Sequence, residues 1–135
     1  MKGSSDLKFL LKNLEPKRVP GEHVFATVSE ATLVALGTIP QLIFREDESI
    51  TVIVSKAEAE EYSLHFESVW GLITLTIHSD LATVGLLAAV TDVLAKAGIS
   101  TNVVSAFYHD HLFVPLARVS EAIILLRNLS KSTAE

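Results

Sequence analysis

The chain has 135 residues, which suffices for one ordinary domain or for two small units that share a core. Hydrophobic residues make up 49%, charged residues 20%, and the mean hydropathy is +0.40, which excludes an intrinsically disordered chain. The formal net charge is −5, and the 11 Lys and Arg residues are spread along the sequence without a basic stripe, so we expect no nucleic-acid partner. A chain this apolar is expected to bury part of its surface against a second copy, and we predict a homodimer.

The longest segments without charge, 68–79 and 81–91, are shorter than the roughly 20 residues of a membrane span, so no membrane partner is expected. The absence of cysteine excludes a disulfide framework and a thiol nucleophile. The opening residues also lack the unbroken apolar core of a secretory signal. We therefore expect a cytoplasmic protein.

The first elements of the chain are short. Leucines at helical spacing behind a Ser/Asp cap predict a helix over 7–14, which Pro16 ends. Alternation of side chains predicts a strand over 23–28, and the ambiguous stretch 29–40 has room for one helical turn.

A hairpin and a helix are predicted next. Two apolar runs, 42–45 and 50–54, flank the acidic turn EDES and predict a hairpin. The capping box SKAE then begins a short helix over 56–62, and a further strand is expected over 63–70.

The second half of the chain has clearer periodicity. Alternation predicts a strand over 72–78, after which Ser79 and Asp80 are expected to cap a helix that ends at Gly98. Strands are predicted over 99–108 and 111–116, followed by a helix over 119–129. The polar tail 130–135 is expected to fray.

The order of these elements favours an α+β fold with two ferredoxin-like (βαββαβ) units in tandem. In each unit an antiparallel sheet would carry its helices on one face. We assign an amino-terminal helix and linker to 1–20, an abbreviated first unit to 21–70 and a second unit with a polar tail to 71–135. The second unit lacks a closing strand, so another strand, from the first half or from a second chain, should complete it.

The segment SAFYHDHLFV predicts a hairpin with a two-residue loop at His109 and Asp110, in which Tyr108 pairs with His111. In this register Phe107 faces the helices, and Asp110 is the turn residue that tolerates a positive φ.

No established catalytic motif occurs in the sequence. His78, Ser79 and Asp80 are neighbours, but consecutive residues point in different directions and do not form a triad. His109 and His111 on one side of a strand are candidate ligands of a transition metal only if a third residue joins them. A metal-assisted enzyme is therefore an alternative to the turn interpretation.

The segment IHSDLATVGLLAAVTDVLAKAGISTNVVSAFYHDHLFVPLARVSEAIILL resembles the ACT domain, a regulatory module of ferredoxin-like fold that binds amino acids where units meet, and the resemblance covers residues 72–129. The shared pattern is an Asp after the first strand, a Gly and paired Leu early in the helix, and A-G-I before the second strand. The hairpin further resembles that of short tandem-ACT proteins, a group related to the cytosolic arginine sensor of TOR signalling.

The resemblance implies a non-enzymatic sensor without a cofactor that binds an amino acid or similar zwitterion at a junction between units. Its ligand would contact the strand-to-helix loop and the adjacent strand and hairpin, at Ser79, Asp80, Thr83, Val84, Gly85, Asn102, Ser105 and Asp110. A structural association module that has lost its ligand is a second possibility. An RNA-binding domain of the same fold would need an exposed aromatic trio, which the strands lack.

Overall fold

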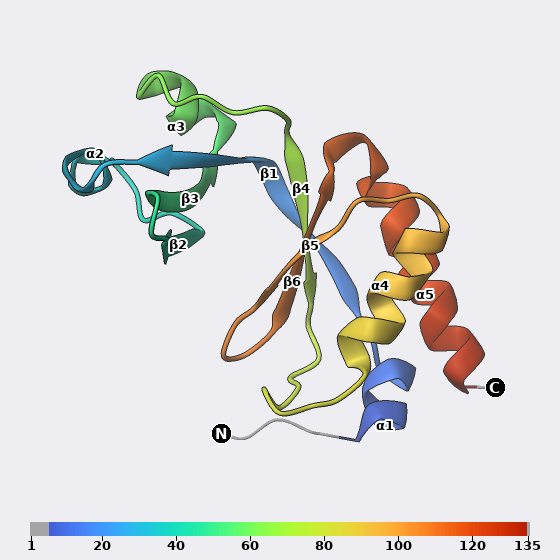
Figure 1. Cartoon of the computed structure of the whole chain (residues 1–135). Coiled ribbons are helices and arrows are strands. Elements are labelled where there is room, and N and C mark those ends of the chain that lie inside the picture. Colours follow the sequence, from blue (N-terminus) through green and yellow to red (C-terminus); the bar gives the residue numbers. More distant parts are fainter. Residues whose placement is uncertain (1–5, 135) are drawn as a thin grey trace. The chain divides into compact units, whose positions relative to one another are not determined.

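The computed structural model describes residues 6–134, and the chain divides into two compact units (Figure 1). Unit 1 combines Met1–Pro20 with Gly71–Glu135, and unit 2 consists of Gly21–Trp70. Ser4, Ser5 and Glu135, which we assigned to the first helix cap and to the tail, lie outside the described residues.

Unit 1 contains the beginning of strand β1 and most of the helical structure. Its sheet has the order β1–β4–β6–β5. The elements are α1 (Leu7–Lys12), the first residues of β1 (Pro16–Val28), β4 (Trp70–Leu75), α4 (Leu86–Lys96), β5 (Asn102–Ser105), β6 (Asp110–Pro115), a short 3-10 helix (Leu116–Arg118) and α5 (Val119–Ala134). The strand that completes this sheet therefore comes from the first half of the same chain.

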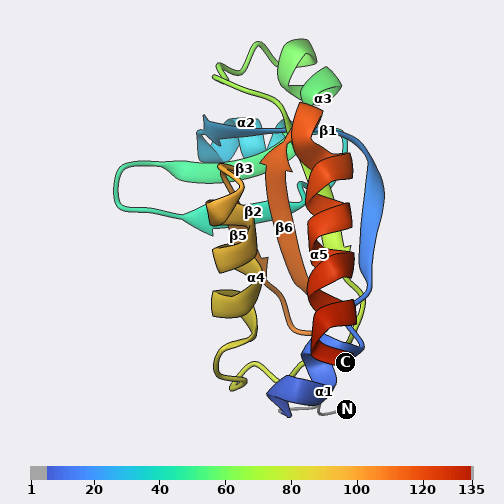
Figure 2. The same ribbon diagram turned by 90° about the vertical axis from the view of Figure 1, so that its right-hand side faces the viewer.

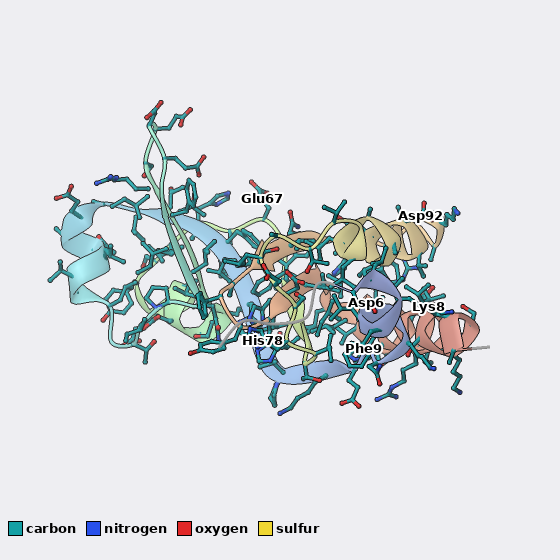
Figure 3. The ribbon with its side chains drawn as sticks, turned by 90° about the horizontal axis from the view of Figure 1, so that it is seen from below. Asp6, Lys8, Phe9, Glu67, His78 and Asp92 are labelled. Atoms are coloured by element: carbon teal, nitrogen blue, oxygen red, sulfur yellow. The ribbon has the colours of Figure 1, made fainter. Side chains whose placement is uncertain are left out.

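Helices α4 and α5 lie on one face of the β4–β6–β5 part of the sheet, as Figure 2 shows. Their apolar stripes meet the inward-facing residues of the strands in a single core, whose fully buried members include Leu10, Ile73, Leu75, Val90, Leu94, Leu112, Val114 and Leu126. Leu10 reaches this core from α1, which packs against both helices and is capped by Asp6 (Figure 3). The amino-terminal helix is thus part of unit 1.

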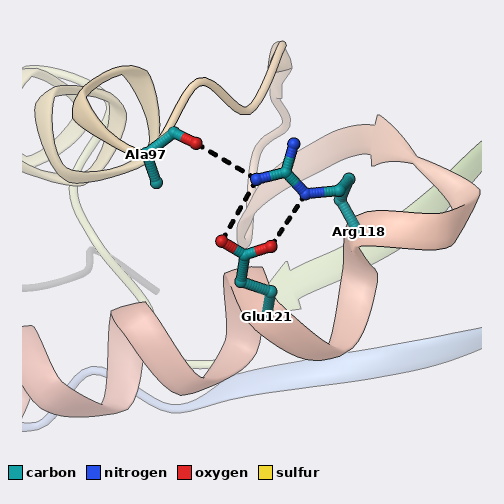
Figure 4. A network of polar contacts seen from close by, with 3 residues as sticks. All are labelled: Ala97, Arg118 and Glu121. Carbon is teal, nitrogen blue, oxygen red and sulfur yellow. Dashed lines mark hydrogen bonds and ion pairs between the residues drawn. The ribbon is translucent and has the colours of Figure 1, made fainter.

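Two polar connections hold the ends of the helices of unit 1. Arg118 donates from Nε to Glu121 at 2.8 Å and from a terminal nitrogen to the Ala97 carbonyl at 3.1 Å, which joins the end of α4 to the start of α5 (Figure 4). The hydroxyl of Ser130 donates to the Lys12 carbonyl at 2.8 Å. Our prediction that the tail frays from residue 130 is wrong for the described residues, because this contact and the serine and threonine hydroxyls that follow keep α5 helical to Ala134.

Unit 2 contains the rest of β1, α2 (Glu30–Ala35), β2 (Leu42–Arg45), β3 (Ile50–Ser55) and α3 (Lys56–Glu61). Its strands have the order β2–β3–β1 and pair antiparallel, with β1 and β3 in register from His23↔Ser55 to Val28↔Ile50. The predicted hairpin is confirmed, and Ser55 caps α3 by accepting a hydrogen bond from the Glu58 amide at 3.1 Å. The predicted capping box is only half formed, because the Glu58 carboxylate accepts hydrogen bonds from the amide and hydroxyl of Thr38.

The strand predicted over 63–70 is wrong, because only Trp70 belongs to a strand. Helix α3 ends with Ser63 at φ 55° and with the Leu64 amide bonded to the Ala59 carbonyl at 2.8 Å, which turns the chain away from an extended path. Leu64, Phe66 and Val69 then pack onto the core of unit 2 from an irregular segment. The alternating apolar residues of this segment are therefore partly buried, as the pattern indicated, but they do not form a strand.

The register predicted for the second hairpin is also wrong. Strands β5 and β6 pair Ser105 with Asp110, and the Ala106 amide donates to the His109 carbonyl at 3.0 Å, so the chain reverses at Phe107 and Tyr108. Phe107 is therefore 61% exposed at the tip and does not face the helices. Asp110 lies in β6 and is 8% exposed, and it has no positive φ because it is paired with Ser105 in the strand ladder.

Gly71 in β4 provides a test of the packing between the sheet and α5. A Cβ at this position would lie 2.2 Å from Cγ2 of the buried Val119. We therefore expect Gly71→Ala to lower the free energy of unfolding by about 1–3 kcal/mol. The control is Gly37→Ala, whose Cβ would have no neighbour closer than 3.8 Å and which should change stability by less than about 0.5 kcal/mol. Equal urea midpoints for the two variants would contradict the close approach.

Candidate functional site

The strand-to-helix loop of unit 1 is joined to the hairpin by a buried hydrogen bond. Ser79, at the start of the loop, donates from its hydroxyl to Oδ2 of Asp110 at 3.2 Å. Both residues are 8% exposed. A carboxylate taken from water in this way needs hydrogen-bond donors around it, and the Ser79 hydroxyl supplies one.

The loop itself is shaped by Asp80. Its Oδ1 accepts the Ala82 amide at 2.8 Å and its carbonyl accepts the Thr83 amide at 2.9 Å, which is a turn in which the side chain imitates the backbone. The prediction that Ser79 and Asp80 cap the following helix is wrong, because this turn leaves several residues between them and α4.

The N-cap of helix α4 is Gly85, which has φ 95° and gives no side-chain cap. The left-handed conformation favours glycine, and a Cβ here would lie 3.1 Å from Cδ2 of Leu7. Since the first amides of a helix have no partner within it, the start of α4 offers hydrogen-bond donors and a partial positive charge that no side chain of the cap takes up.

These elements enclose a small cavity of about 110 Å³. Its lining consists of Ser79, Asp80, Leu81, Thr83, Gly85, Leu86, Leu87, Ala88, Ser105 and Asp110. Six of the residues predicted from the sequence therefore lie together. Val84 and Asn102 are not among the lining residues, and Val84 is 84% exposed. The sequence prediction did not include Leu86, Leu87 and Ala88 in the first turn of α4. The helix predicted directly after the loop could have indicated them.

The cavity is lined by a hydrogen-bond acceptor, the Asp110 carboxylate, and by hydrogen-bond donors, the first amides of α4. The Asp110 carboxylate can accept hydrogen bonds from a ligand ammonium group, and the amides at the start of α4 can donate to a ligand carboxylate. An arrangement of this kind suits a zwitterion and offers no nucleophile paired with a base.

Apolar side chains surround the loop and the tip of the hairpin. Leu81, Val84, Phe107 and Tyr108 are each between 60% and 84% exposed. The ring of Tyr108 lies 5.7 Å from that of His78 between centroids, which brings the hairpin tip close to the start of the loop. So many exposed large apolar residues around one cavity are typical of a surface that another molecule covers.

Three histidines lie along the same end of unit 1. The ring of His109 is 6.4 Å from that of His78 and 6.4 Å from that of His111, measured between centroids. His111 Nδ1 is hydrogen-bonded to the Thr74 hydroxyl at 2.9 Å. Burial and then the nearby His109 lower the pKa of His111, which the Asp110 charge partly opposes. No group of three His, Cys, Asp or Glu side chains within residues 6–134 is placed to hold a metal ion.

Comparisons with known proteins agree with this architecture. Two sequence-family profiles described as ACT domain match residues 2–71 and 67–128. No curated protein sequence matches the chain. Among residues 6–134, no helix combines the length and apolar character that crossing a bilayer requires.

Solved structures extend the likeness to nearly the whole chain. A protein of unknown function from Vibrio cholerae, described as a possible transport protein, is 35% identical with a TM-score of 0.82 and covers 93% of this chain and 97% of its own. A protein from Agrobacterium tumefaciens is 22% identical with a TM-score of 0.65, covering 87% and 89%. The regulatory subunit of aspartate kinase from Thermus flavus shares the fold at 10% identity and a TM-score of 0.65, covering 85% and 96%. With two profile matches in tandem and a relative of this identity and coverage, the chain belongs to the ACT domain family, whose members are regulatory modules.

Proposed function

We propose that the protein is a non-enzymatic, cytoplasmic regulatory protein that binds an amino acid or similar small zwitterion in the cavity between the Ser79–Gly85 loop and the β5–β6 hairpin. The observation that carries the proposal is that one cavity is lined both by the buried Asp110 carboxylate and by the first turn of α4. Membership of the ACT family supports a regulatory role, and fold neighbours that are regulatory subunits of aspartate kinase agree with it.

The ligand is held at its two charged ends. Its carboxylate receives hydrogen bonds from the first amides of α4, where the helix dipole favours negative charge. Its ammonium group lies against Asp110, with the hydroxyls of Ser79 and Ser105 as further partners. Because Ser79 already donates to Asp110, the carboxylate is oriented before the ligand arrives, which lowers the cost of binding.

The cavity becomes part of a larger site in a homodimer. The exposed Leu81 and Val84 of the loop, with Phe107 and Tyr108 of the hairpin, form the apolar surface that a second copy covers. A ligand bound beneath this surface favours the dimer arrangement that closes over it. The protein therefore reports amino-acid concentration by a shift between arrangements.

A second candidate function is an association module without a ligand. The observation in its favour is that Ser79 already donates a hydrogen bond to Asp110 within the unit, so the buried carboxylate has a partner without a ligand. Under this alternative the loop and the hairpin only support the apolar surface that pairs the two copies.

A thermal-shift screen with dialysed protein and each of the common amino acids separates the two functions. At a concentration about 100 times its dissociation constant, a true ligand should stabilise the fold by about 2.7 kcal/mol and raise the Tm. A rise with one amino acid or a few related ones supports a sensor. No rise with any of them contradicts the sensor and favours the association module.

Asp110→Asn tests how the amino group is recognised. Asparagine keeps the shape and can still accept the Ser79 hydrogen bond, but the charge that attracts an ammonium group is lost. We expect the affinity for the ligand found in the screen to fall roughly tenfold to hundredfold, measured by calorimetry. Asp92→Asn is the control, since Asp92 is exposed on α4 and pairs with Lys96 away from the cavity. Equal affinities of the two variants would show that Asp110 does not hold the ligand.

Two valines of nearly equal exposure test the predicted homodimer. Val84 in the loop is 84% exposed and Val34 in unit 2 is 86% exposed. We expect Val84→Asp to shift the mass measured by size exclusion with light scattering toward the monomer, because a carboxylate would be buried at the interface. Val34→Asp should leave the mass unchanged. A native mass equal to that of one chain, or an unchanged dimer with Val84→Asp, would refute this interface.

A further inference from the structure

A second and larger groove lies in unit 1, between helix α5 and the beginning of β1. Figure 2 shows this part of β1 running beside α5. The groove has a volume of about 780 Å³, within the range of roughly 300–1,000 Å³ that small-molecule sites occupy. Its lining consists of Leu14, Glu15, Pro16, Lys17, Arg18, Thr76, Ser120, Ile123, Ile124 and Arg127. It shares no residue with the cavity at Ser79.

The apolar part of the groove consists of Leu14, Pro16, Ile123 and Ile124. On α5, Ser120, Ile123, Ile124 and Arg127 follow the i, i+3, i+4, i+7 spacing of one helix face, so the two isoleucines lie between a serine and an arginine. Ile124 is 57% exposed although it is a large aliphatic residue. This helix face is about 10 Å long at the rise of an α-helix, which matches a small molecule and is too short to seat a partner helix of several turns.

The rim of the groove is cationic. Lys17, Arg18 and Arg127 line it with Glu15 as the one acidic residue, which leaves two excess positive charges in a chain of net charge −5. The ion pairs found within residues 6–134 are His65–Glu67, Lys96–Asp92 and Arg118–Glu121, so none of them neutralises these three cations. Unpaired guanidinium groups beside an apolar surface attract a carboxylate or phosphate that carries an apolar body.

The strand edge in the groove is unsuited to pairing with another strand. The Glu15 carbonyl accepts from the Thr76 amide at 3.0 Å, so alternation turns the backbone groups of residues 16, 18 and 20 toward the open edge. Pro16 and Pro20 have no amide hydrogen, and Arg18 is left as the only donor of the three. Addition of a strand from a second copy is therefore disfavoured, and a ligand that uses side chains is favoured.

We propose that this groove is a binding site for a small amphipathic anion. Its acidic head is held by Lys17, Arg18 and Arg127, and its aliphatic body lies on Leu14, Pro16 and the isoleucines of α5. The site is independent of the amino-acid cavity, and its occupation is a second input to a regulatory protein.

Octanoate is the probe, because it combines a carboxylate with an aliphatic chain of suitable length. Titration into ¹⁵N-labelled protein should shift the amide signals of α5 and of the beginning of β1 to saturation. Octylammonium, which has the same chain and the opposite charge, should bind at least about tenfold more weakly, as should acetate, which lacks the chain. Raising the salt concentration should weaken octanoate binding, because exposed charges are screened.

Substitutions in the groove test whether octanoate binds there. Arg127→Glu reverses a charge at the rim and Ile124→Asp places one in the apolar part, and since both residues are exposed the fold should be kept. Each should weaken octanoate binding at least about tenfold. Lys8→Glu is the matched charge reversal, on α1 outside the groove lining, and should not change it (Figure 3).

The proposal is overturned if octanoate produces no saturable shifts, if octylammonium binds as tightly, or if Lys8→Glu weakens binding as much as Arg127→Glu. Salt dependence of the unmodified protein provides a readout that does not rely on the folding of any variant. Binding that is insensitive to salt would show that the cations do not hold the head group.

Discussion

The structure of unit 1 depends on the pairing of the beginning of β1 with β4. This pairing joins residues near position 15 to residues beyond position 70, as the hydrogen bonds from Thr76 to the Glu15 carbonyl show. Because β1 completes the sheet, α1 is brought against α4 and α5, and Leu10 and Leu14 enter the core. The larger groove exists for the same reason, since its two walls are the beginning of β1 and α5.

The two candidate sites of unit 1 differ in their chemistry. The cavity at Ser79 is small, buried at its base and bipolar, with a carboxylate and a helix start in one lining. The groove along α5 is wide and combines an apolar part with uncompensated cations. A zwitterion suits the first and an amphipathic anion the second, so the two ligands would not compete. A regulatory module with two such sites can combine two signals in one change of arrangement.

Features that depend on residues close together in the sequence were predicted correctly, and features that depend on distant residues were not. The helix cap at Ser55 and the hairpin around residues 46–49 were predicted correctly, because both are decided by residues only a few positions apart. The register of the β5–β6 hairpin was not, because Asp110 lies in the strand among contacts with distant residues, such as its hydrogen bond with Ser79, 31 positions away. The irregular segment after α3 was mistaken for a strand because apolar spacing measures burial, which loops also provide.

The sequence by itself determined the family, the order of the elements apart from the strand expected over 63–70, and the loop that lines the smaller candidate site, because periodicity and motif residues are local properties. The tertiary structure alone decided which strand completes unit 1, that Asp110 is buried, and that α4 follows Gly85 as its N-cap, with its first turn in the cavity lining. It also brought Arg127 into one groove with Lys17 and Arg18, which lie more than 100 positions away in the sequence. The physical reason is that side chains from distant positions share a surface only after the strands have paired and the helices have packed on them.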